Sequence, residues 1–523
     1  MDPHFILPPS HRQPLFGVAA TRAIEARSVA ALPPHTLMQR AGVAVARLAL
    51  AVAPHARRVW VVAGPGNNGG DGFEAAAELQ RLGKAVHVTL GADPQHLPAD
   101  AQASLARAQA AGVTIVADGG PELAEHDVAI DALLGIGTRR TVQGPLAALI
   151  ERLNAVGCAV LAVDVPSGLD ADTGQPLGGP CVVARHTLSL LTLKPGLFTG
   201  AGRDHAGRVW LDTLDAAAGT EPPDAWLAGT LDGLGSMPSR RHAQHKGSFG
   251  DVAVVGGAAG MTGAALLAAR AAHAAGAGRV FVNLLDGSAS THDLQRPELM
   301  FRPQWAADAP GVLAASTVVC GCGGGDAVRE VMPRLLSRVP RLVLDADALN
   351  AIAADPMLQT LLRARADAGH ATVLTPHPLE AARLLGQNTA QVQSDRLSAV
   401  RGLATLFGCV VLLKGSGTVV AAPGHVPSIN PTGHASLASA GTGDVLAGWV
   451  GGAWAQAGGS PVSTSTSASA AQAAAPASPA APTSQAFGVA VAAAFRHGAA
   501  ADACDDSPLR AADLVERMHG IWR

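Results

Sequence analysis

The chain has 523 residues, of which 48% are hydrophobic and 15% charged, and its formal net charge is −3. A chain of this length and apolar content is expected to fold into two or more globular domains. The balanced charge and an aromatic content of 3%, without Tyr, argue against nucleic acid or an anionic membrane as the main partner.

The cysteines and the apolar segments indicate a cytoplasmic protein. The spacing of the six cysteines predicts neither a disulfide framework nor a four-ligand zinc site, and Cys320 and Cys322 are interpreted as buried or loop thiols. The apolar stretch 264–277 is short and contains Arg270 and His273, so it predicts a buried helix rather than a membrane span. The first residues lack the charged-then-apolar order of a secretory signal.

The first half of the chain alternates apolar strands with helices. Strands are predicted at 57–64, 85–91, 126–135 and 158–168, and a helix is predicted from about 73 to 82. Continuous apolar strands in this alternation are typical of a parallel sheet with helices on both faces.

A second series of the same kind follows a segment rich in Gly, Pro and Ser. That segment, about 216–241, is taken as the domain boundary, which gives domains at 1–225 and 235–523. The second series predicts another doubly wound α/β domain. Its strands are expected at 251–257, 278–285, 315–321, 341–349, 371–377 and 409–415.

Residues 458–485 are of low complexity and are predicted to form a disordered insertion inside the second domain. The helical pattern resumes at 486–502. The insertion is therefore expected to separate two helices that pack against each other.

The sharpest motif is the run of small residues at 440–443 that leads into Asp444 and an apolar helix. Backbone amides of a Gly-rich turn and the helix dipole together favour a phosphate or a charged transition state. An acid at that point suits a general base that takes a proton from a hydroxyl attacking phosphorus. The alternative is a solvated Asp at a helix cap.

Neighbouring motifs favour the catalytic interpretation. Lys414 follows a strand and enters a Gly-rich turn, and His377 stands where another strand ends. Ligands of open α/β sheets bind at the carboxyl ends of the strands. Several Gly-rich strand exits with Lys, His and Asp in one domain are hard to explain by packing alone.

The first half carries a polar block of its own, "NNGGDG" at 67–72. Asp131, Asp164 and Ser167 stand at two further strand ends. Amide and carboxylate oxygens converging at strand ends suit a hard cation or ribose hydroxyls. Taken singly, each turn would more often be structural.

The segments "HKGSFG", "LVLDADAL", "LTPHPLEAARLL", "LLKGSGT" and "NPTG" through "AGTGDVLAG" closely resemble the ADP/ATP-dependent NAD(P)H-hydrate dehydratases of the ribokinase-like superfamily. The resemblance covers about 240–520. It implies a nucleotide site, with Mg²⁺ accompanying ADP or ATP, and a substrate site that includes the catalytic base Asp444. The nucleotide site would comprise Lys414, Gly415, Ser416, Gly417, Thr418 and Gly443, and the substrate site Ala264, Gly323, His377 and Asp444.

Two departures from this family's pattern occur in the chain. The usual Gly-Pro-Gly-Leu-Gly stretch is here "GCGGG" at 321–325, which predicts a looser loop. Ala440 stands where a third Gly is common.

The first half, about 15–225, resembles the NAD(P)H-hydrate epimerase domain through "GPGNNGGDG", "DALLGIG" and "DVPSGLD". The resemblance implies a potassium site at Asn68, Asp131 and Ser167, with Asp164 as acid and base and Lys194 nearby. The implied substrate contacts are Asn67, Asn68, Gly69, Gly70, Asp71, Gly135, Ile136, Gly137, Thr138, Arg139, Arg140, Thr141 and Asp164.

Together these resemblances predict two three-layer αβα domains, the first Rossmann-like and the second ribokinase-like. They imply a bifunctional enzyme that epimerises hydrated NADH and NADPH and then dehydrates the S form with ADP or ATP. They also imply small-molecule substrates and a homo-oligomer. Two alternatives stay open at this point: a ribokinase-like small-molecule kinase, and a non-catalytic nucleotide-binding scaffold.

Overall fold

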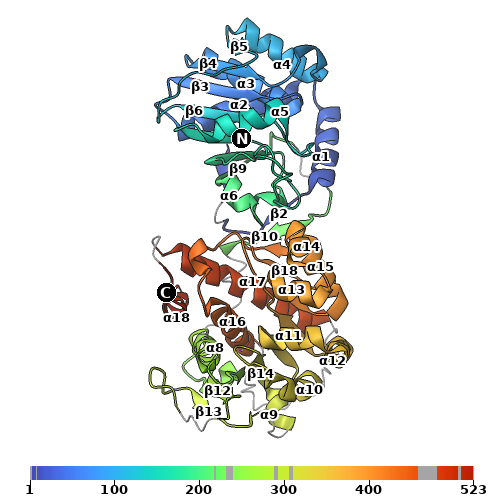
Figure 1. Ribbon diagram of the computed structural model, residues 1–523, viewed down its shortest axis with the longest axis vertical. Coiled ribbons are helices and arrows are strands. Elements are labelled where there is room, and N and C mark those ends of the chain that lie inside the picture. The colour runs from blue at the N-terminus through green and yellow to red at the C-terminus, as the bar shows by residue number, and fades with distance from the viewer. Residues whose placement is uncertain are drawn as a thin grey trace, which may run out of the picture. The chain divides into compact units, whose positions relative to one another are not determined.

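The structure, a computed structural model, describes residues 3–6, 9–216, 220–230, 240–287, 292–305, 310–457, 480–504 and 508–521. The chain divides into two units by its internal contacts. Unit 1 comprises Met1–Pro9 and Gln13–Leu227, and unit 2 comprises Ser10–Arg12 and Ala228–Arg523. In Figure 1, unit 1 runs from blue to green and unit 2 from green to red.

Unit 1 is built on a mostly parallel sheet with the order β1-β9-β8-β7-β6-β3-β4-β5. Only the β1–β9 pair in this sheet is antiparallel. Strands β2 and β10 pair with each other in antiparallel fashion. The strands are β1 (His4–Phe5), β2 (Gln13–Leu15), β3 (Arg58–Ala63), β4 (Ala85–Leu90), β5 (Thr114–Val116), β6 (Val128–Ala132), β7 (Ala159–Val163), β8 (His186–Leu190), β9 (Arg208–Asp212) and β10 (Ala225–Leu227).

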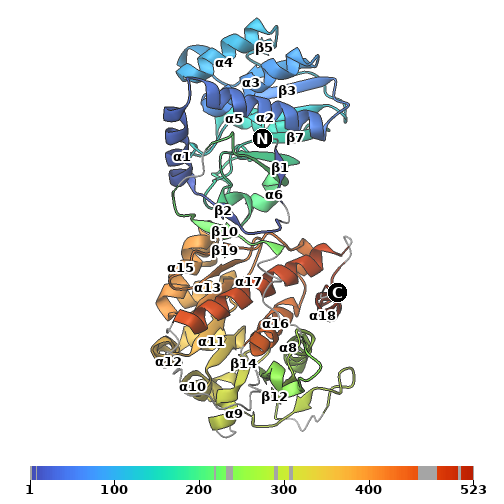
Figure 2. The same ribbon diagram turned by 180° about the vertical axis from the view of Figure 1, so that it is seen from behind.

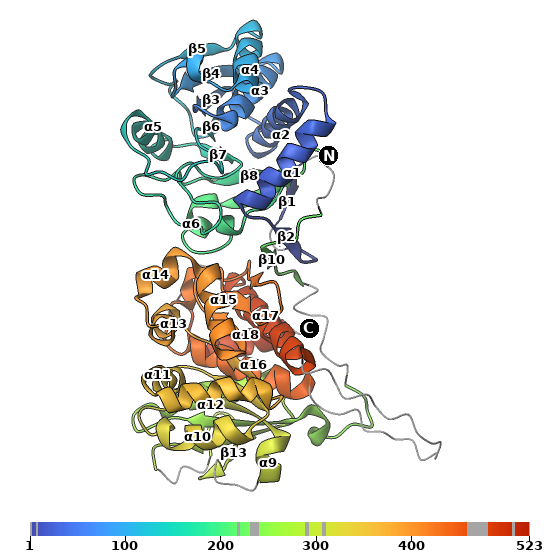
Figure 3. The same ribbon diagram turned by 90° about the vertical axis from the view of Figure 1, so that its right-hand side faces the viewer.

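Helices cover both faces of this sheet. Alternate residues of β3 enter different hydrophobic clusters: Val59 and Val61 pack with α2, α3 and α4, whereas Trp60 and Val62 pack with α5. Figure 3 shows α5 on one side of the strands and α3 and α4 on the other. A strand buried on both faces has no polar alternation, which explains the continuous apolar run. The helices are α1 (Val18–Ala31), α2 (Thr36–Val52), α3 (Asn67–Arg81), α4 (Ala99–Ala110), α5 (Gly144–Asn154) and α6 (Gly202–Ala206).

Unit 2 repeats this plan. The strands β13-β12-β11-β14-β15-β16-β17 are parallel, and β18 and β19 continue the sheet in antiparallel fashion. The expected α/β class with parallel sheets is therefore confirmed. The strands are β11 (Asp251–Gly256), β12 (Arg279–Leu284), β13 (Met300–Phe301), β14 (Ser316–Cys320), β15 (Arg341–Leu344), β16 (Ala371–Leu374), β17 (Val410–Leu413), β18 (Val419–Ala421) and β19 (Ser428–Ile429).

The helices of unit 2 flank the sheet on both sides. Helices α8, α16, α17 and α18 share one hydrophobic cluster with β11, while α15 packs against β17 and α12 against β16. The helices are α8 (Thr262–Ala274), α9 (Pro310–Ala315), α10 (Val328–Arg338), α11 (Asp347–Ala354), α12 (Pro356–Asp367), α13 (Pro378–Leu385), α14 (Thr389–Ser394), α15 (Arg396–Phe407), α16 (Thr442–Ala457), α17 (Ala480–Asp502) and α18 (Ala511–Gly520).

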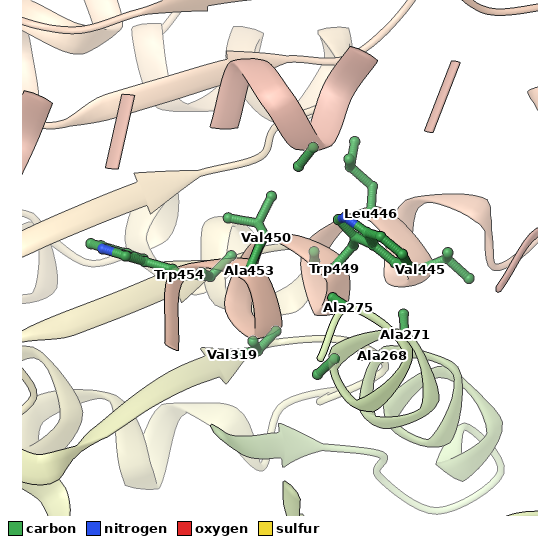
Figure 4. Packing of buried hydrophobic residues seen from close by; sticks show 14 of the residues in the cluster. Ala268, Ala271, Ala275, Val319, Val445, Leu446, Trp449, Val450, Ala453 and Trp454 are labelled. Atoms are coloured by element: carbon green, nitrogen blue, oxygen red, sulfur yellow. The ribbon is translucent and has the colours of Figure 1, made fainter. Parts of the chain in front are cut away.

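Helix α16, which carries Asp444, lies against α8 at very short range. A Cβ added at Gly448 would lie 2.0 Å from the carbonyl oxygen of Ala268, and one added at Gly452 would lie 2.2 Å from that of Ala272. Figure 4 shows α16, which carries Trp449, Val450 and Ala453, beside Ala268 and Ala271 of α8, with the side chain of Val450 directed away from α8. Glycine and alanine at the crossing therefore hold the helix in place without a gap.

The second helix of the expected pair, α17, packs against α16 as predicted (Figure 2). It begins at Ala480 rather than 486, so the last part of the expected insertion is helical. The rest of that insertion, 458–479, lies outside the described residues. Among the helices that the structure describes, none has the length and apolarity that a membrane crossing requires.

Three expected boundaries are wrong, and each lies at a strand exit. Helix α3 begins at Asn67 and not near 73, because its glycines tolerate backbone contact: a Cβ at Gly69 would meet the oxygen of Gly64 at 2.2 Å. Strand β7 ends at Val163, where Asp164 turns with a φ of 68°. Strand β15 ends at Leu344, and α11 begins at Asp347.

Candidate active sites

Unit 1 contains a cavity of about 600 Å³ at the carboxyl ends of β3, β6 and β7. These three strands are neighbours in the sheet, so the residues that follow them meet at one edge. Helices α1 and α2 complete the wall. The lining includes Thr21, Arg22, Glu25, Met38, Pro65, Gly66, Asn67, Asn68, Asp71, Asp100, Leu133, Leu134, Gly135, Ile136, Gly137, Thr138, Asp164, Leu190 and Leu214.

Most of the residues predicted to contact substrate in unit 1 line this cavity. The structure brings together Asn67, Asn68, Asp71, Gly135, Ile136, Gly137, Thr138 and Asp164. It places Gly69, Gly70, Arg139, Arg140 and Thr141 outside the lining. The two glycines face inward, since a Cβ at Gly70 would lie 2.6 Å from the sulfur of Met38. The other three are exposed farther along their loop.

Asp164 and Lys194 form a buried ion pair beside the cavity. The side chain of Lys194 is 0% exposed, and its Nζ also donates to the carbonyl oxygen of Leu190 at 2.7 Å and to Ser189 Oγ at 3.2 Å. The amide of Leu190 donates to Asp164 Oδ1 at 3.2 Å. These bonds fix one oxygen of Asp164 and leave the carboxylate at the cavity wall.

Asp71 and Glu25 also line the cavity, together with Asp100. Burial, followed by the charges of Asp164 and Glu25, raises the pKa of Asp71 well above its usual value. Burial and then Asp164 also raise the pKa of Glu25, against the opposing effect of Lys194 and Arg22. Glu25 lies in "TRAIE", but no sequence pattern places it in the site, because it comes from α1 and not from a strand end.

Asp131 and Ser167 are hydrogen-bonded to each other, and Asn68 lines the cavity. Ser167 donates to Asp131 from both Oγ, at 2.6 Å, and its backbone amide, at 2.8 Å. Burial raises the pKa of Asp131 to about 6, against these hydrogen bonds. In the described part of the chain, the groups that donate to Asp131 are neutral, and the buried Nδ2 of Asn68 has no hydrogen-bond partner. A buried carboxylate with oxygen donors around it fits a cation.

In unit 2, Asp444 stands in the first turn of α16, and Lys414 and Asp345 approach it from two strand ends. Lys414 Nζ donates to Asp345 Oδ1 at 2.8 Å. A Cβ at Gly443 would lie 3.2 Å from the same nitrogen, so the ammonium reaches the mouth of the helix. Asp444 is partly exposed and is therefore available to a substrate.

The pKa of Asp444 reflects these neighbours. Burial and then the carboxylate of Asp345 raise it to about 6, while a hydrogen bond with the Cys322 thiol and the charge of Lys414 lower it. Burial disfavours the charged form of Lys414, but Asp345 and Glu380 leave its pKa raised, so the ammonium persists. A carboxylate with a pKa near neutrality suits a general base.

The turn at 414–418, the predicted nucleotide site, is held from below by Arg396. This side chain is 1% exposed, and its Nη2 donates to the carbonyl oxygens of Leu413 and Lys414, each at 3.2 Å. Gly415 has a φ of 130°, which a residue with a side chain rarely adopts. The turn thus exposes its backbone around Gly415 and Ser416.

His377 caps helix α13. Its Nδ1 accepts from the amides of Leu379 and Glu380, at 3.1 and 3.4 Å, and its Nε2 lies 3.2 Å from Glu380 Oε1. Burial opposes ionisation of Glu380, but the bonds from His377 and the charge of Lys414 lower its pKa. His377 thus contacts Glu380, and Glu380 in turn interacts electrostatically with Lys414, which lies near Asp444.

The remaining predicted substrate residues, Ala264 and Gly323, touch each other. Gly323 has a φ of 59°, and a Cβ there would lie 2.9 Å from that of Ala264. The structure adds Asp345, Glu380 and Cys322 to the site. Asp345 and Glu380 stand within motifs that the sequence analysis quoted, but nothing in the sequence indicated that they meet Lys414.

Comparisons with known proteins give a family match for each half of the chain. A family model described as YjeF-related protein N-terminus matches residues 34–196, and one described as NAD(P)H-hydrate dehydratase matches residues 252–518. A solved structure titled ADP/ATP-dependent NAD(P)H-hydrate dehydratase from Bacillus subtilis, co-crystallized with ATP/Mg²⁺, is 24% identical. It covers 55% of this chain and 95% of its own, with a TM-score of 0.42.

Full-length relatives match across both units. The bifunctional NAD(P)H-hydrate repair enzyme Nnr of Escherichia coli is 38% identical over 445 residues, which is 82% of each chain. The Coxiella burnetii protein of the same name is 36% identical over 81% of this chain and 86% of its own. The chain belongs to the family of bifunctional NAD(P)H-hydrate repair enzymes.

Proposed function

We propose that the two sites divide the repair of hydrated NADH and NADPH between them. Unit 1 interconverts the R and S hydrates at the cavity that Asp164 borders. Unit 2 removes water from the S hydrate at the expense of a nucleoside polyphosphate, at the mouth of α16. The observation that supports this division most strongly is the meeting of Asp444, Lys414 and Asp345 at the start of that helix.

In unit 2, Asp444 accepts the proton of the substrate hydroxyl while that oxygen attacks the terminal phosphorus of ADP or ATP. The nucleotide leaves without its terminal phosphoryl group. The C–O bond of the phosphate ester then breaks, and the phosphate group departs as inorganic phosphate. The substrate loses a proton from the neighbouring carbon, and the ring double bond returns. Lys414 and the backbone at 414–418 and Gly443 bind the phosphates. Ala264, Gly323 and His377 border the substrate.

Magnesium is expected to arrive with the nucleotide and not on a protein cage. Among the described residues, one group of His, Cys, Asp or Glu side chains could hold a metal ion. It consists of Cys322, Asp345 and Asp444, whose ligand atoms lie within 4.8 Å of one another. A thiol is a poor ligand for Mg²⁺, which prefers oxygen. Asp345 is moreover engaged by Lys414. This donor set therefore does not fit Mg²⁺.

In unit 1, Asp164 acts as the acid and base while the configuration at the hydroxyl-bearing ring carbon inverts. Lys194 keeps the carboxylate in place. Asn68, Asp131 and Ser167 would hold a potassium ion, which, when bound, supplies the charge that neutralises Asp131. The substrates are small molecules, and we propose a cytoplasmic homo-oligomer.

A mixture of R and S hydrates tests the division. The parent protein with ADP or ATP and Mg²⁺ should restore the absorbance of the whole mixture at the reduced nicotinamide band. Asp164→Asn should restore only the fraction that is already S, and Asp444→Asn should restore none. Recovery of the full absorbance by Asp164→Asn would contradict the role of unit 1.

The small-molecule kinase is the alternative that the unit 2 site still permits, because the same base and phosphate contacts would serve it. A kinase would accumulate a stable phosphorylated product. Phosphate release coupled to recovery of absorbance excludes it.

A further inference from the structure

The loop "GCGGG" places a cysteine beside Asp444. Cys322 is 0% exposed, and its Sγ lies within 4.8 Å of a carboxylate oxygen of Asp345 and one of Asp444. Lys414 Nζ already neutralises Asp345 from 2.8 Å. The cluster is therefore organised around an ammonium and a thiol proton, not around a metal ion.

The backbone prevents this thiol from moving away. The carbonyl oxygen of Cys322 accepts from the amide of Gly257 at 2.9 Å, and that of Gly323 accepts from the amide of Ala258 at 2.6 Å. A Cβ at Gly256 would lie 2.4 Å from the same Cys322 oxygen, so the loop is seated on the end of β11. The extra glycines in the loop therefore do not loosen it at Cys322.

The sulfur keeps its proton. Burial, and after it the charge of Asp444, raises the pKa of the Cys322 thiol well above its usual value. The protonated thiol can act as a donor, and a carboxylate oxygen of Asp444 lies within 4.8 Å of its sulfur. The other charged groups that act on Asp444 are Asp345, Asp347 and Lys414.

We propose that Cys322 is a positioning residue, whose S–H donates to the Asp444 carboxylate and fixes the direction in which that carboxylate accepts the substrate proton. The proposal rests on the proposed function of unit 2. The S–H bond stays intact throughout, and Asp444 alone gains the proton. A donor to the charged form also favours ionised Asp444 and so offsets the repulsion from Asp345.

The acid limb of the dehydratase pH profile is the readout. We expect Cys322→Ala to move the limb of kcat/KM upward by about 0.5–1 pH unit, the range that the loss of one modest hydrogen bond gives. Cys322→Ser keeps a donor and should leave the limb at the parent position or below it. An unshifted limb in Cys322→Ala, or an upward shift in Cys322→Ser, would overturn the proposal.

Cys320→Ala is the matched control. Cys320 is equally buried, but its sulfur contacts the sulfur of Met332 at 3.9 Å. In this variant, the acid limb of kcat/KM should lie at the same pH as in the parent protein. A parent protein without dehydratase activity would contradict the proposed function. An active parent whose acid limb does not move in Cys322→Ala would contradict only the role of Cys322, so the two failures are distinguishable. Should Cys322→Ala not fold, the direction of the Cys322→Ser limb alone decides.

Discussion

Single residues set the chemistry of both sites through the balance of burial and neighbouring charge. Burial and the charge of Asp345 raise the pKa of Asp444, whereas Cys322 and Lys414 lower it. In unit 1, the ammonium of Lys194 accompanies Asp164. Each of the two proposed catalytic carboxylates thus has a lysine as a neighbour.

Asp444→Asn should abolish the dehydratase while the protein still binds nucleotide. The amide cannot accept the substrate proton, and loss of a general base lowers the rate by roughly 10²–10⁴-fold. Nucleotide binding is measured by calorimetry and turnover by nicotinamide absorbance. Asp326→Asn, at a fully exposed side chain of the same unit, should behave like the parent.

The dehydratase should also lose activity in acid. The base works only when ionised, and the pKa of Asp444 is about 6. The rate therefore stays level above that pH and falls about tenfold per unit well below it, since the protonated fraction then dominates. A profile of kcat/KM from pH 5 to 8 that stayed flat would contradict this assignment.

Lys194→Met should destabilise unit 1, because it leaves the buried Asp164 without its partner. Removal of one member of a buried ion pair costs roughly 3–5 kcal/mol in the free energy of unfolding. Asp164→Asn combined with Lys194→Met removes the stranded charge and should recover part of that loss. Chemical unfolding of the single and double variants measures both effects. Equal losses in the two would speak against the pair.

The sequence indicated Asp444, Lys414 and Asp164 because each stands directly at a Gly-rich or polar strand exit. It did not indicate how Asp345, Glu380 or Glu25 would meet them. Those contacts join elements far apart in the chain, and only the strand order brings them together. Cys322 was interpreted as a buried or loop thiol, which is correct, but its contact with Asp444 depends on the same topology.

At the scale of elements, glycines determine where α3 begins and how closely α16 packs against α8. The long apolar strands were predictable because burial on both faces leaves a continuous apolar pattern. The start of α3 was not, since Asn and Gly are poor helix formers and only the close approach to the backbone of Gly64 explains them. The same holds for the end of β15, where the strand turns within three residues into α11.

Gly448→Ala should destabilise unit 2, because the new Cβ would lie 2.0 Å from the oxygen of Ala268 and force α16 away from α8. Overpacking of this kind costs about 1–3 kcal/mol. Gly488→Ala is the matched control, since it stands in α17 with open space around a Cβ. It should stabilise the protein by about 0.5–1 kcal/mol, the usual gain of alanine over glycine in a helix. Equal effects in thermal unfolding would refute the packing argument.

At the scale of the whole molecule, each unit has its own run of parallel strands, its own hydrophobic clusters and its own candidate catalytic side chains. We therefore expect the two activities to be separable by mutation in the full chain. Asp164→Asn should leave turnover of pure S hydrate unchanged, and Asp444→Asn should leave the rate of R to S interconversion unchanged. A loss of both activities from either substitution would show that the sites depend on each other.

In the proposed function of unit 2, Asp444 activates a substrate hydroxyl toward a nucleotide. The most direct measurement follows phosphate release and reduced nicotinamide together, with pure S hydrate, ADP or ATP, and Mg²⁺. We predict equal amounts of both products from the parent protein and neither from Asp444→Asn. Nicotinamide recovered without phosphate, or a phosphorylated product that persists, would contradict the claim.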